Sequence, residues 1–431
     1  MAHGGVMEPS AGRRHSVRGL CPASVLLVGA LILAACSANA PNSQPIGLTL
    51  QAPADVPSTD PGQQLKVALI VSLSAQGQPG LIGKSLKQAA ELALFERDSP
   101  SLQLIVKDDK GTPEGARAAA EEAIKGGAQL ILGPLFAKAA SAVAPAARQA
   151  HVPVLSFSTD IHVAGNGVYL LSFQPAPEVA RVVAYAAQSG KRRFTALIPD
   201  DAFGKVASAA FRDAVSRVGG TVVALETYPL SANGVLEPMR KVSAAIQSAE
   251  ADGSPVDALF LPGGQEHVEL VARLLPQAEI DTQKVKILGT GGMDYPNAGR
   301  EARLVGAWYP APDPRGWTEF AQRYAKSYGQ APPRIASLAH DAVGLAIALS
   351  SGADGRGLDA GALTRPGGFT GVDGAYRLLR DGTTERALAI LEVQKFGAGI
   401  VDPGSGLAAP GQSPGSVGTA SSLPKSILNF Q

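Results

Sequence analysis

Short apolar runs alternate with helix-length amphipathic stretches along most of this chain. Residues 67–71 form a continuous apolar run, which is typical of a strand covered on both faces. A Gly-rich loop follows, and between Ile82 and Ala93 the apolar residues recur at helical spacing. The same alternation predicts three more strands in this part of the chain, at 102–106, 130–132 and 152–156.

The rhythm repeats in a second run of strand–helix units. Here the expected strands are 194–198, 221–225, 258–261 and 285–288, and the expected helices are 178–188, 205–218, 235–249 and 266–275. Strands that alternate with helices of this length imply parallel sheets built from right-handed crossovers. The pattern therefore predicts an α/β protein with two doubly wound parallel-sheet lobes.

Local signals mark the ends of one early helix. Thr112-Pro113-Glu114 combines a capping hydroxyl, a first-turn proline and an acid near the positive helix end. Gly126-Gly127 is expected to end the same helix. We therefore predict a helix between these two signals.

The last third of the chain breaks the alternation. Helices are expected at 317–328 and 335–349. Residues 376–379 and 388–393 flank an Asp381-Gly382 turn, which predicts a β-hairpin at a sheet edge.

The two ends of the chain have a different composition. Residues 37–64 are rich in Ala, Pro, Ser, Gln and Asn, which is typical of a flexible tether. Residues 397–424 are dominated by Gly, Pro, Ser and Ala, which cannot bury enough apolar surface to offset chain entropy. We expect a disordered tail over 397–431.

The N-terminus carries a targeting signal. Basic residues, among them Arg13, Arg14 and Arg18, precede an apolar stretch over 20–35, which ends in small residues before Cys36. That order is typical of a secretory signal peptide. The alternative is an uncleaved transmembrane anchor, but a spanning helix needs about 20 apolar residues and this stretch is shorter.

The four residues Leu33-Ala34-Ala35-Cys36 resemble a lipoprotein lipobox. That resemblance implies a signal peptide over 1–35, cleavage before Cys36 and lipid, such as palmitate, on this residue. The body would then lie in the periplasm, anchored to a membrane by a tether over 36–64. Ser37 lacks the aspartate associated with inner-membrane retention, so the outer membrane is favoured over the inner one.

Composition excludes several classes of function. The net charge of +1 indicates neither nucleic acid nor an acidic surface as a partner. The two cysteines are Cys21, in the expected signal peptide, and Cys36, the expected lipid site. The mature body then has no thiol for a disulfide, for thiol catalysis or for a cysteine-ligated metal. Without the signal peptide the chain is too long for one ordinary domain and suits two lobes.

Candidate chemistry lies in the loops after the strands, because ligands bind beyond the carboxyl ends of strands in open α/β sheets. These loops are 72–77, 108–109, 133–138 and 156–160 in the first lobe, and 199–204, 228–230, 263–265 and 289–294 in the second. If the lobes face each other, the loops line one cleft. The alternative is that they are ordinary turns and helix caps.

Catalytic motifs are weak in this sequence. Gly83-Lys84-Ser85 lacks the P-loop glycine, since Gln78 stands at its place. The hydrolase-like string at 411–415 lies in the expected disordered tail. The histidines show no metal-ligand spacing, and no nucleophile, base and orienting partner occur together. We expect no enzyme activity, no metal and no cofactor.

In its order of motifs the chain resembles the type I periplasmic binding proteins, specifically the Leu/Ile/Val-binding group. The resemblance covers 65–395. Its marks are 67–74 with Gly77 and Gly83, Asp108-Asp109 with Gly115-Ala116, Gly126-Gly127-Ala128, Gly133-Pro134, 152–156, 201–204 and Phe369-Thr370-Gly371 with Gly374. It implies two lobes joined by a multi-strand hinge. The implied N-terminal lobe is 65–172 plus 309–365, and the C-terminal lobe is 173–308 plus 366–396.

The resemblance also implies a ligand site. In the amino-acid binders of this group, hydroxyls and amides of two first-lobe loops hold the ligand carboxylate, and an acid of the last cleft loop holds its ammonium group. This chain has Gly291-Gly292 at the acid's place, with Asp294 displaced from it. The implied ligand-binding residues are Ser74, Leu135, Phe136, Ala137, Ser158, Thr159, Phe203, Gly264, Gly291 and Asp294.

Two functions follow from these resemblances. Within the superfamily, the sequence at Gly133-Pro134-Leu135 and 154–160 is similar to that of lipoproteins called penicillin-binding protein activators. The first hypothesis is a solute-binding lipoprotein that presents a small polar or amino-acid-like ligand to an ABC permease. The alternative is a regulator that contacts a peptidoglycan synthase.

Overall fold

The computed structural model describes residues 64–295, 297–350, 358–404 and 407. The expected signal peptide, Cys36 and all but the last residue of the tether lie outside the described residues. So does 408–431 of the expected tail. All of these described residues belong to one compact unit.

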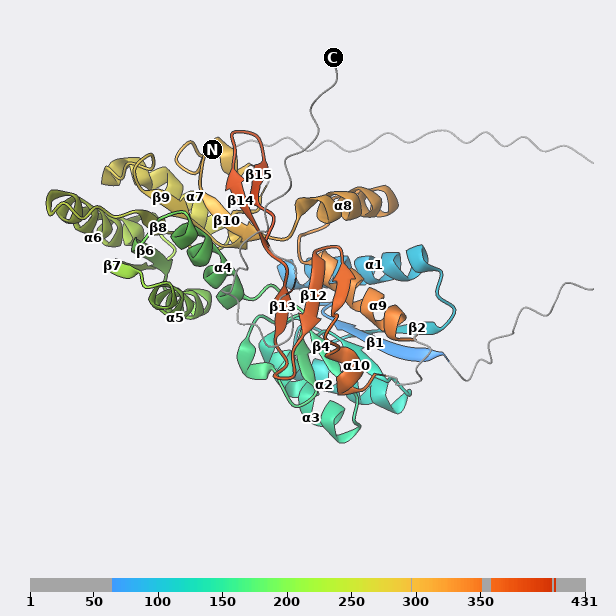
Figure 1. Cartoon of the computed structure of the whole chain (residues 1–431). Coiled ribbons are helices and arrows are strands. Elements are labelled where there is room, and N and C mark those ends of the chain that lie inside the picture. The colour runs from blue at the N-terminus through green and yellow to red at the C-terminus, as the bar shows by residue number, and fades with distance from the viewer. Residues whose placement is uncertain (1–63, 296, 351–357, 405–406, 408–431) are drawn as a thin grey trace, which may run out of the picture. The chain divides into compact units, whose positions relative to one another are not determined.

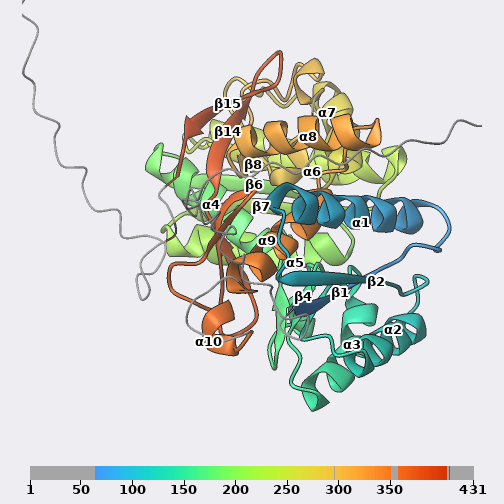
Figure 2. The same ribbon diagram turned by 90° about the vertical axis from the view of Figure 1, so that its right-hand side faces the viewer.

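The first sheet is parallel and has the strand order β2-β1-β3-β4-β5. Its central strand β1 alternates between two cores: Val67, Leu69 and Val71 face α1 and α9, whereas Ala68 and Ile70 face α2 and α3. In Figures 1 and 2, α1 accordingly lies on one side of β1, and α2 and α3 lie on the other. The elements are β1 (Leu65–Val71), α1 (Gln78–Arg97), β2 (Leu102–Asp108), α2 (Pro113–Lys125), β3 (Leu130–Leu132), α3 (Ala137–Gln149), β4 (Val154–Ser156), η2 (Ile161–Val163) and β5 (Val168–Leu170).

The second sheet has the order β15-β14-β10-β9-β8-β6-β7, and its strands from β7 to β10 are parallel. Strand β6 alternates in the same way: Phe194, Ala196 and Ile198 face α4 and α5, whereas Leu197 faces the core under α6 and α7. The elements are α4 (Pro175–Gln188), β6 (Arg193–Pro199), α5 (Ala202–Arg217), β7 (Thr221–Tyr228), α6 (Ala232–Ala251), β8 (Ala258–Phe260), α7 (Gln265–Leu274), η3 (Leu275–Ala278), β9 (Lys286–Leu288), η4 (Gly291–Met293), η5 (Ala298–Arg300) and β10 (Trp308–Ala311).

The last part of the chain contributes to both cores. Apolar residues of α8 and α9 pack with the first sheet, and so do those of the small antiparallel sheet β11-β12-β13. Strand β14 returns to the second sheet, antiparallel to β10, and β15 forms its edge. The elements are α8 (Pro314–Tyr328), α9 (Ala336–Ser350), α10 (Ala360–Leu363), β11 (Phe369–Gly371), β12 (Gly374–Leu378), β13 (Thr384–Arg386), β14 (Ala389–Val393) and β15 (Ala398–Asp402).

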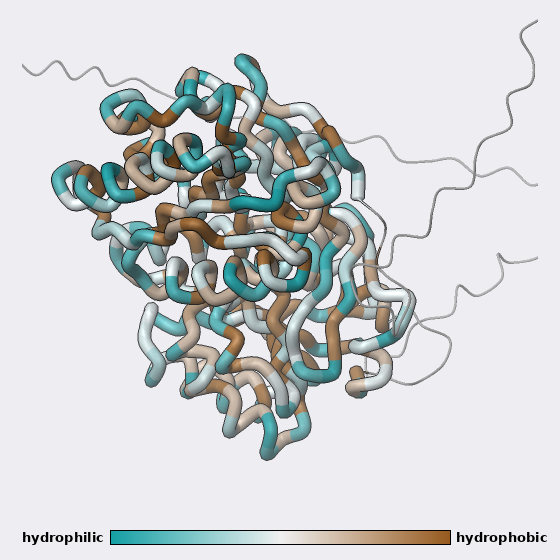
Figure 3. The backbone as a smooth tube through the Cα atoms, turned by 60° about the vertical axis from the view of Figure 1, so that its left-hand side comes forward, coloured by the Kyte–Doolittle hydropathy of each residue, from teal (hydrophilic) through white to brown (hydrophobic). Residues whose placement is uncertain are grey.

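Backbone hydropathy follows this layering. In Figure 3 the hydrophobic segments run mainly through the interior, and hydrophilic segments mark many outer turns and helix faces. The predicted helix start at Thr112 is confirmed, because its Oγ1 accepts a hydrogen bond from the Gly115 amide at 3.0 Å. The helix ends at Lys125, before Gly126.

Three expectations differ from the structure. The 376–379 segment pairs with β13 instead of 388–393, which forms β14 in the other sheet. Residues 398–402, expected to be disordered, form the edge strand β15. The third difference is in the lobe division: 369–378 pack with the first core and β10 belongs to the second sheet.

These differences share one physical reason. Short strands are stabilised by their neighbours in the sheet and by burial on its faces, and not by their own propensity. Residues 398–402 are mostly exposed, yet their backbone pairs with β14 from Ile390 to Val393. Composition alone therefore could not predict this strand.

Candidate functional site

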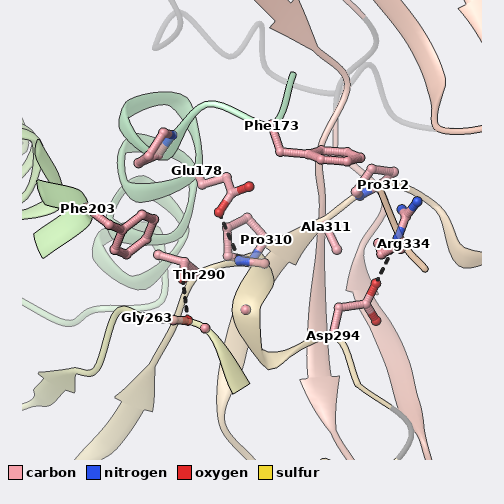
Figure 4. Close-up of a pocket in the computed structure, with 14 residues that line it drawn as sticks. Phe173, Glu178, Phe203, Gly263, Thr290, Asp294, Pro310, Ala311, Pro312 and Arg334 are labelled. Carbon is pink, nitrogen blue, oxygen red and sulfur yellow. Dashed lines mark hydrogen bonds and ion pairs between the residues drawn. The ribbon is translucent and has the colours of Figure 1, made fainter. Parts of the chain in front are cut away.

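A pocket of about 280 Å³ lies at the carboxyl ends of the second sheet's strands (Figure 4). Residues of the segments 173–178 and 310–312, together with Arg334, complete its walls. The residues that line it are Phe173, Pro175, Glu178, Phe203, Gly263, Gly264, Thr290, Gly291, Gly292, Asp294, Pro310, Ala311, Pro312 and Arg334. The pocket thus occurs where parallel α/β sheets bind ligands.

Glu178 supplies a buried carboxylate to this pocket. It lies in the first turns of α4 and is 9% exposed. Its Oε2 accepts a hydrogen bond of 2.9 Å from the Gly291 amide. Burial raises the pKa of Glu178 to about 7; the Gly291 hydrogen bond and the charges of Arg334 and Arg386 oppose this rise, and Asp294 adds to it. At neutral pH this carboxyl group is therefore partly protonated.

Gly291 is fitted closely to that carboxylate. A Cβ atom built on Gly291 would lie 3.1 Å from Oε1 of Glu178. A larger residue at 291 would push either the loop or the carboxylate away. The glycine that stands at the place of the expected acid therefore makes room for an acid from another helix.

Arg334 supplies the positive charge of the pocket. Its Nη1 pairs with Oδ1 of the buried Asp373 at 2.5 Å, and its Nε lies 3.7 Å from Oδ2 of Asp294. The guanidinium also packs over the rings of Trp317 and Phe173, at 4.5 and 5.2 Å from their centroids. These contacts fix the guanidinium at the wall of the pocket, where a ligand anion can reach it.

Asp294 is a second acid at this wall. Tyr309 donates a hydrogen bond of 3.3 Å to its Oδ1. Burial raises the pKa of Asp294, and the charge of Arg334 is the largest effect that opposes the rise. The pocket therefore presents two acids and one guanidinium on walls that are otherwise largely apolar.

The second-lobe residues that the resemblance implied come together in this pocket. Phe203, Gly264, Gly291 and Asp294 all line it. Phe203 is placed by the start of α5, where Asp201 caps the helix by accepting a 2.7 Å hydrogen bond from the Gly204 amide. Phe203 is thereby held beside Gly263 and Thr290 in Figure 4.

The first-lobe candidates do not line this pocket. Ser158 is buried after β4, where its oxygens bond Asp160 and Ser172. Phe136 is 40% exposed at the start of α3. The others lie on the loops after β1, β3 and β4 or at the start of α3, as expected, and they are Ser74, Leu135, Ala137 and Thr159.

Sequence reasoning missed Glu178, Arg334 and Phe173. The sequence pattern indicates Glu178 only as the first residue of a helix, where acids commonly face the positive helix end. Arg334 follows two prolines between α8 and α9, in a segment without a motif. An acid and an arginine 156 positions apart carry no shared local signal, so only the tertiary structure brings them to one pocket.

The family of the chain is decided by a match over most of its length. Residues 64–398 match the family model described as periplasmic binding protein. The chain belongs to this family. Solute-binding proteins of this kind are typically non-enzymatic, and membership implies a location outside the cytoplasm. No helix among the described residues is long and apolar enough to cross a membrane.

Solved structures share the fold of this periplasmic binding protein. One is a putative branched-chain amino acid ABC transporter protein from Rhodospirillum rubrum, with TM-score 0.68, 20% identity and coverage of 78% of this chain and 100% of that chain. A second is a solute-binding protein from R. palustris in complex with 4-hydroxybenzoate, with TM-score 0.58, 20% identity and coverage of 79% of this chain and 96% of that chain. A third is a branched-chain amino acid binding protein from Streptococcus pneumoniae in complex with isoleucine, with TM-score 0.57, 19% identity and coverage of 79% of this chain and 100% of that chain.

A curated relative is an uncharacterized protein from Rickettsia prowazekii. It is 20% identical over 235 residues, which is 54% of this chain and 62% of that protein. The alignment thus spans less than two thirds of the relative's length. These comparisons establish the Leu/Ile/Val-binding type of fold; the closeness to penicillin-binding protein activators stays a prediction.

Proposed function

We propose that this protein is the solute-binding component of an ABC-type importer and that it binds a small polar solute with a carboxylate group. The observation that carries the proposal is the pocket of about 280 Å³ with a fixed guanidinium, Arg334, between apolar walls. Pockets of this kind use a few placed polar groups to orient a ligand and apolar walls to bury it.

The ligands in the related structures support this class. Isoleucine and 4-hydroxybenzoate differ in size and amino group, but both carry a carboxylate. In this chain, Nη1 and Nε of Arg334 face Asp373 and Asp294. Its Nη2 has no hydrogen bond with any described residue and is free to bond a ligand carboxylate. On hinge closure the exposed first-lobe candidates, such as Phe136 and Thr159, would complete the site.

We also propose that the protein is anchored by lipid at Cys36 and delivers its solute to a permease in the same envelope. The lipobox resemblance at 33–36 supports the anchor, and family membership supports the export. No observation favours the peptidoglycan-synthase alternative over this function.

A thermal-shift screen of the purified protein against amino acids and aromatic acids tests the proposal. A ligand at 100 times its dissociation constant should stabilise the folded protein by about 2.7 kcal/mol. Phe203→Ala should weaken the response, whereas Phe95→Ala, at a side chain that is 84% exposed on α1, should not. No shift with any member at large excess contradicts the proposed function.

A further inference from the structure

A second pocket lies at the opposite end of the second sheet from the pocket of Arg334. Its volume is about 120 Å³, and its walls come from the turns that lead into β6, β9 and β10 and from the first residues of β9. Four of the described residues that line it are cationic and none is acidic; the four are Lys191, Lys284, Lys286 and Arg303. We call it the basic pocket.

Lys286 is held in place at the wall of the basic pocket. Its Nζ donates a 2.9 Å hydrogen bond to the Gly306 carbonyl and lies 4.3 Å from the centroid of the Trp308 ring. The turn that offers this carbonyl depends on Gly306, because its φ of 88° favours glycine. Oε2 of Glu392 lies 3.6 Å from the same Nζ and accepts a 2.9 Å hydrogen bond from Nε1 of Trp308. The fold thus positions this ammonium group in advance of any ligand.

Two other cations of the basic pocket have no partner. Lys191 and Arg303 are half-buried, yet neither side chain makes a hydrogen bond or an ion pair with any residue in the described part of the chain. Two neutral donors of the lining, the hydroxyl of Thr282 and the side-chain amide of Gln283, are likewise unbonded among the described residues. The basic pocket therefore offers four free donor groups, of which two are charged.

Acids close to the basic pocket are already engaged. Glu392 is shared by Lys286 and Trp308, as described above, and Glu250 is paired with Lys284 at 2.8 Å. The acid that precedes β8, between the turns of the pocket, is Asp257. Its Oδ2 accepts hydrogen bonds of 2.7 and 2.9 Å from the backbone amides of the two residues at 192 and 193. These acids leave the charges of Lys191 and Arg303 uncompensated.

Like charges that face one pocket repel each other, and the repulsion is stronger near the protein than in bulk water because the effective dielectric constant is lower. A bound anion would remove this repulsion. A tetrahedral oxyanion presents oxygens in several directions, which suits donors that converge from separate turns. A phosphate group carries a charge of about −1.5 to −2 at pH 7, which matches two unpaired cations. The pocket volume also exceeds the roughly 10–15 Å³ that one water molecule requires.

We propose that the basic pocket binds a phosphate group, either as inorganic phosphate or as part of a phospholipid headgroup. Lys191 and Arg303 donate charged hydrogen bonds to its oxygens, and Lys286 supplies a fixed positive charge beside them. This site is separate from the pocket of Arg334, since the two lie at opposite ends of the same strands. A phosphate group and a solute can therefore be bound at the same time.

Titration calorimetry of the purified protein tests the proposal with three probes at constant ionic strength. Inorganic phosphate and glycerol 3-phosphate represent a free phosphate, and glycerophosphoglycerol represents the headgroup of an anionic phospholipid. Trp308 locates the bound probe, because a phosphate that attracts the Lys286 ammonium changes its contact with the indole ring. Fluorescence is read in a Trp317→Phe background, where Trp308 is the only tryptophan.

A pair of double variants separates a built site from general charge attraction. Lys191→Gln with Arg303→Gln removes the two cations that no contact of the folded protein uses. The matched control is Lys326→Gln with Arg212→Gln, which removes the same charge from α8 and α5. Both control side chains are exposed and, among the described residues, make no hydrogen bond or ion pair.

The expected result is saturable binding of at least one probe, weakened at least about tenfold by the pocket variant and unchanged by the control, since each charged hydrogen bond contributes on that order. Tighter binding of inorganic phosphate identifies a free anion as the ligand, and tighter binding of glycerophosphoglycerol identifies a lipid headgroup; the site stands in both cases. No saturable binding of any probe at large excess, or equal weakening by the pocket variant and the control, overturns the proposal.

Discussion

Replacement of Glu178 by glutamine should remove a pH-dependent part of the stability. The pKa of this carboxyl group rises from 4.5, its ordinary value, to about 7 in the folded protein because it is buried. Between these values the folded state binds more protons than the unfolded state, so the free energy of unfolding falls as pH rises. This contribution is present below pH 4.5 and is lost as the pH passes 7.

The magnitude follows from the two pKa values. Each unit of difference corresponds to about 1.4 kcal/mol, so the full effect is about 3 kcal/mol. Between pH 5 and pH 8, Glu178 should cost about 2 to 3 kcal/mol of stability. Glutamine cannot ionise and its oxygen can still accept the bond from the Gly291 amide. The free energy of unfolding of the variant, relative to that of the native protein, should therefore increase as the pH rises.

Urea denaturation at pH 5 and pH 8 measures this difference. Trp308 of β10 is a local probe, because its ring packs on Tyr185 of α4 with centroids 4.8 Å apart. A Trp317→Phe background makes it the only tryptophan, which separates its transition from unfolding elsewhere. If the native protein and Glu178→Gln lose equal stability from pH 5 to pH 8, the reasoning about the buried carboxylate is refuted.

Three further predictions concern the pocket and the anchor. Gly291→Ala should lower stability by about 1–3 kcal/mol in urea melts, because its Cβ would crowd Oε1 of Glu178; Gly264→Ala, which meets nothing within 4 Å, is the control, and equal effects would contradict the fit. Phe203→Ala should weaken binding of the best ligand about tenfold by calorimetry, since it removes a wall of the pocket, and unchanged affinity would exclude that role. Cys36→Ser should release the protein from membrane fractions, and continued attachment would favour an uncleaved anchor.

The alternating pattern was sufficient to predict both parallel sheets. A continuous apolar run such as 67–71 must be covered on both faces, and the helices that follow in sequence are near enough to cover it. The helices at 317–328 and 335–349 were likewise predicted to within three residues of Pro314–Tyr328 and Ala336–Ser350. These elements depend on periodicity, which a sequence contains.

Pairing between distant segments was not predictable in the same way. Residues 388–393 have the pattern of a strand, but whether that strand pairs with β12 or with β10 depends on where the chain crosses between the sheets. The edge strand 398–402 exists because β14 offers it a backbone partner. Such choices depend on the neighbours that folding provides.

The pocket residues likewise include some that the sequence predicts and some that it does not. The rule that ligands bind beyond the carboxyl ends of strands was enough to select the loops of Phe203, Gly264 and Gly291, because strand direction follows from the order of the elements. Glu178 and Arg334 were decided only by the tertiary structure. Burial against Gly291 turns Glu178 from an ordinary first-turn acid into a group with a pKa of about 7, and no sequence pattern records which side chains exclude water from a carboxylate.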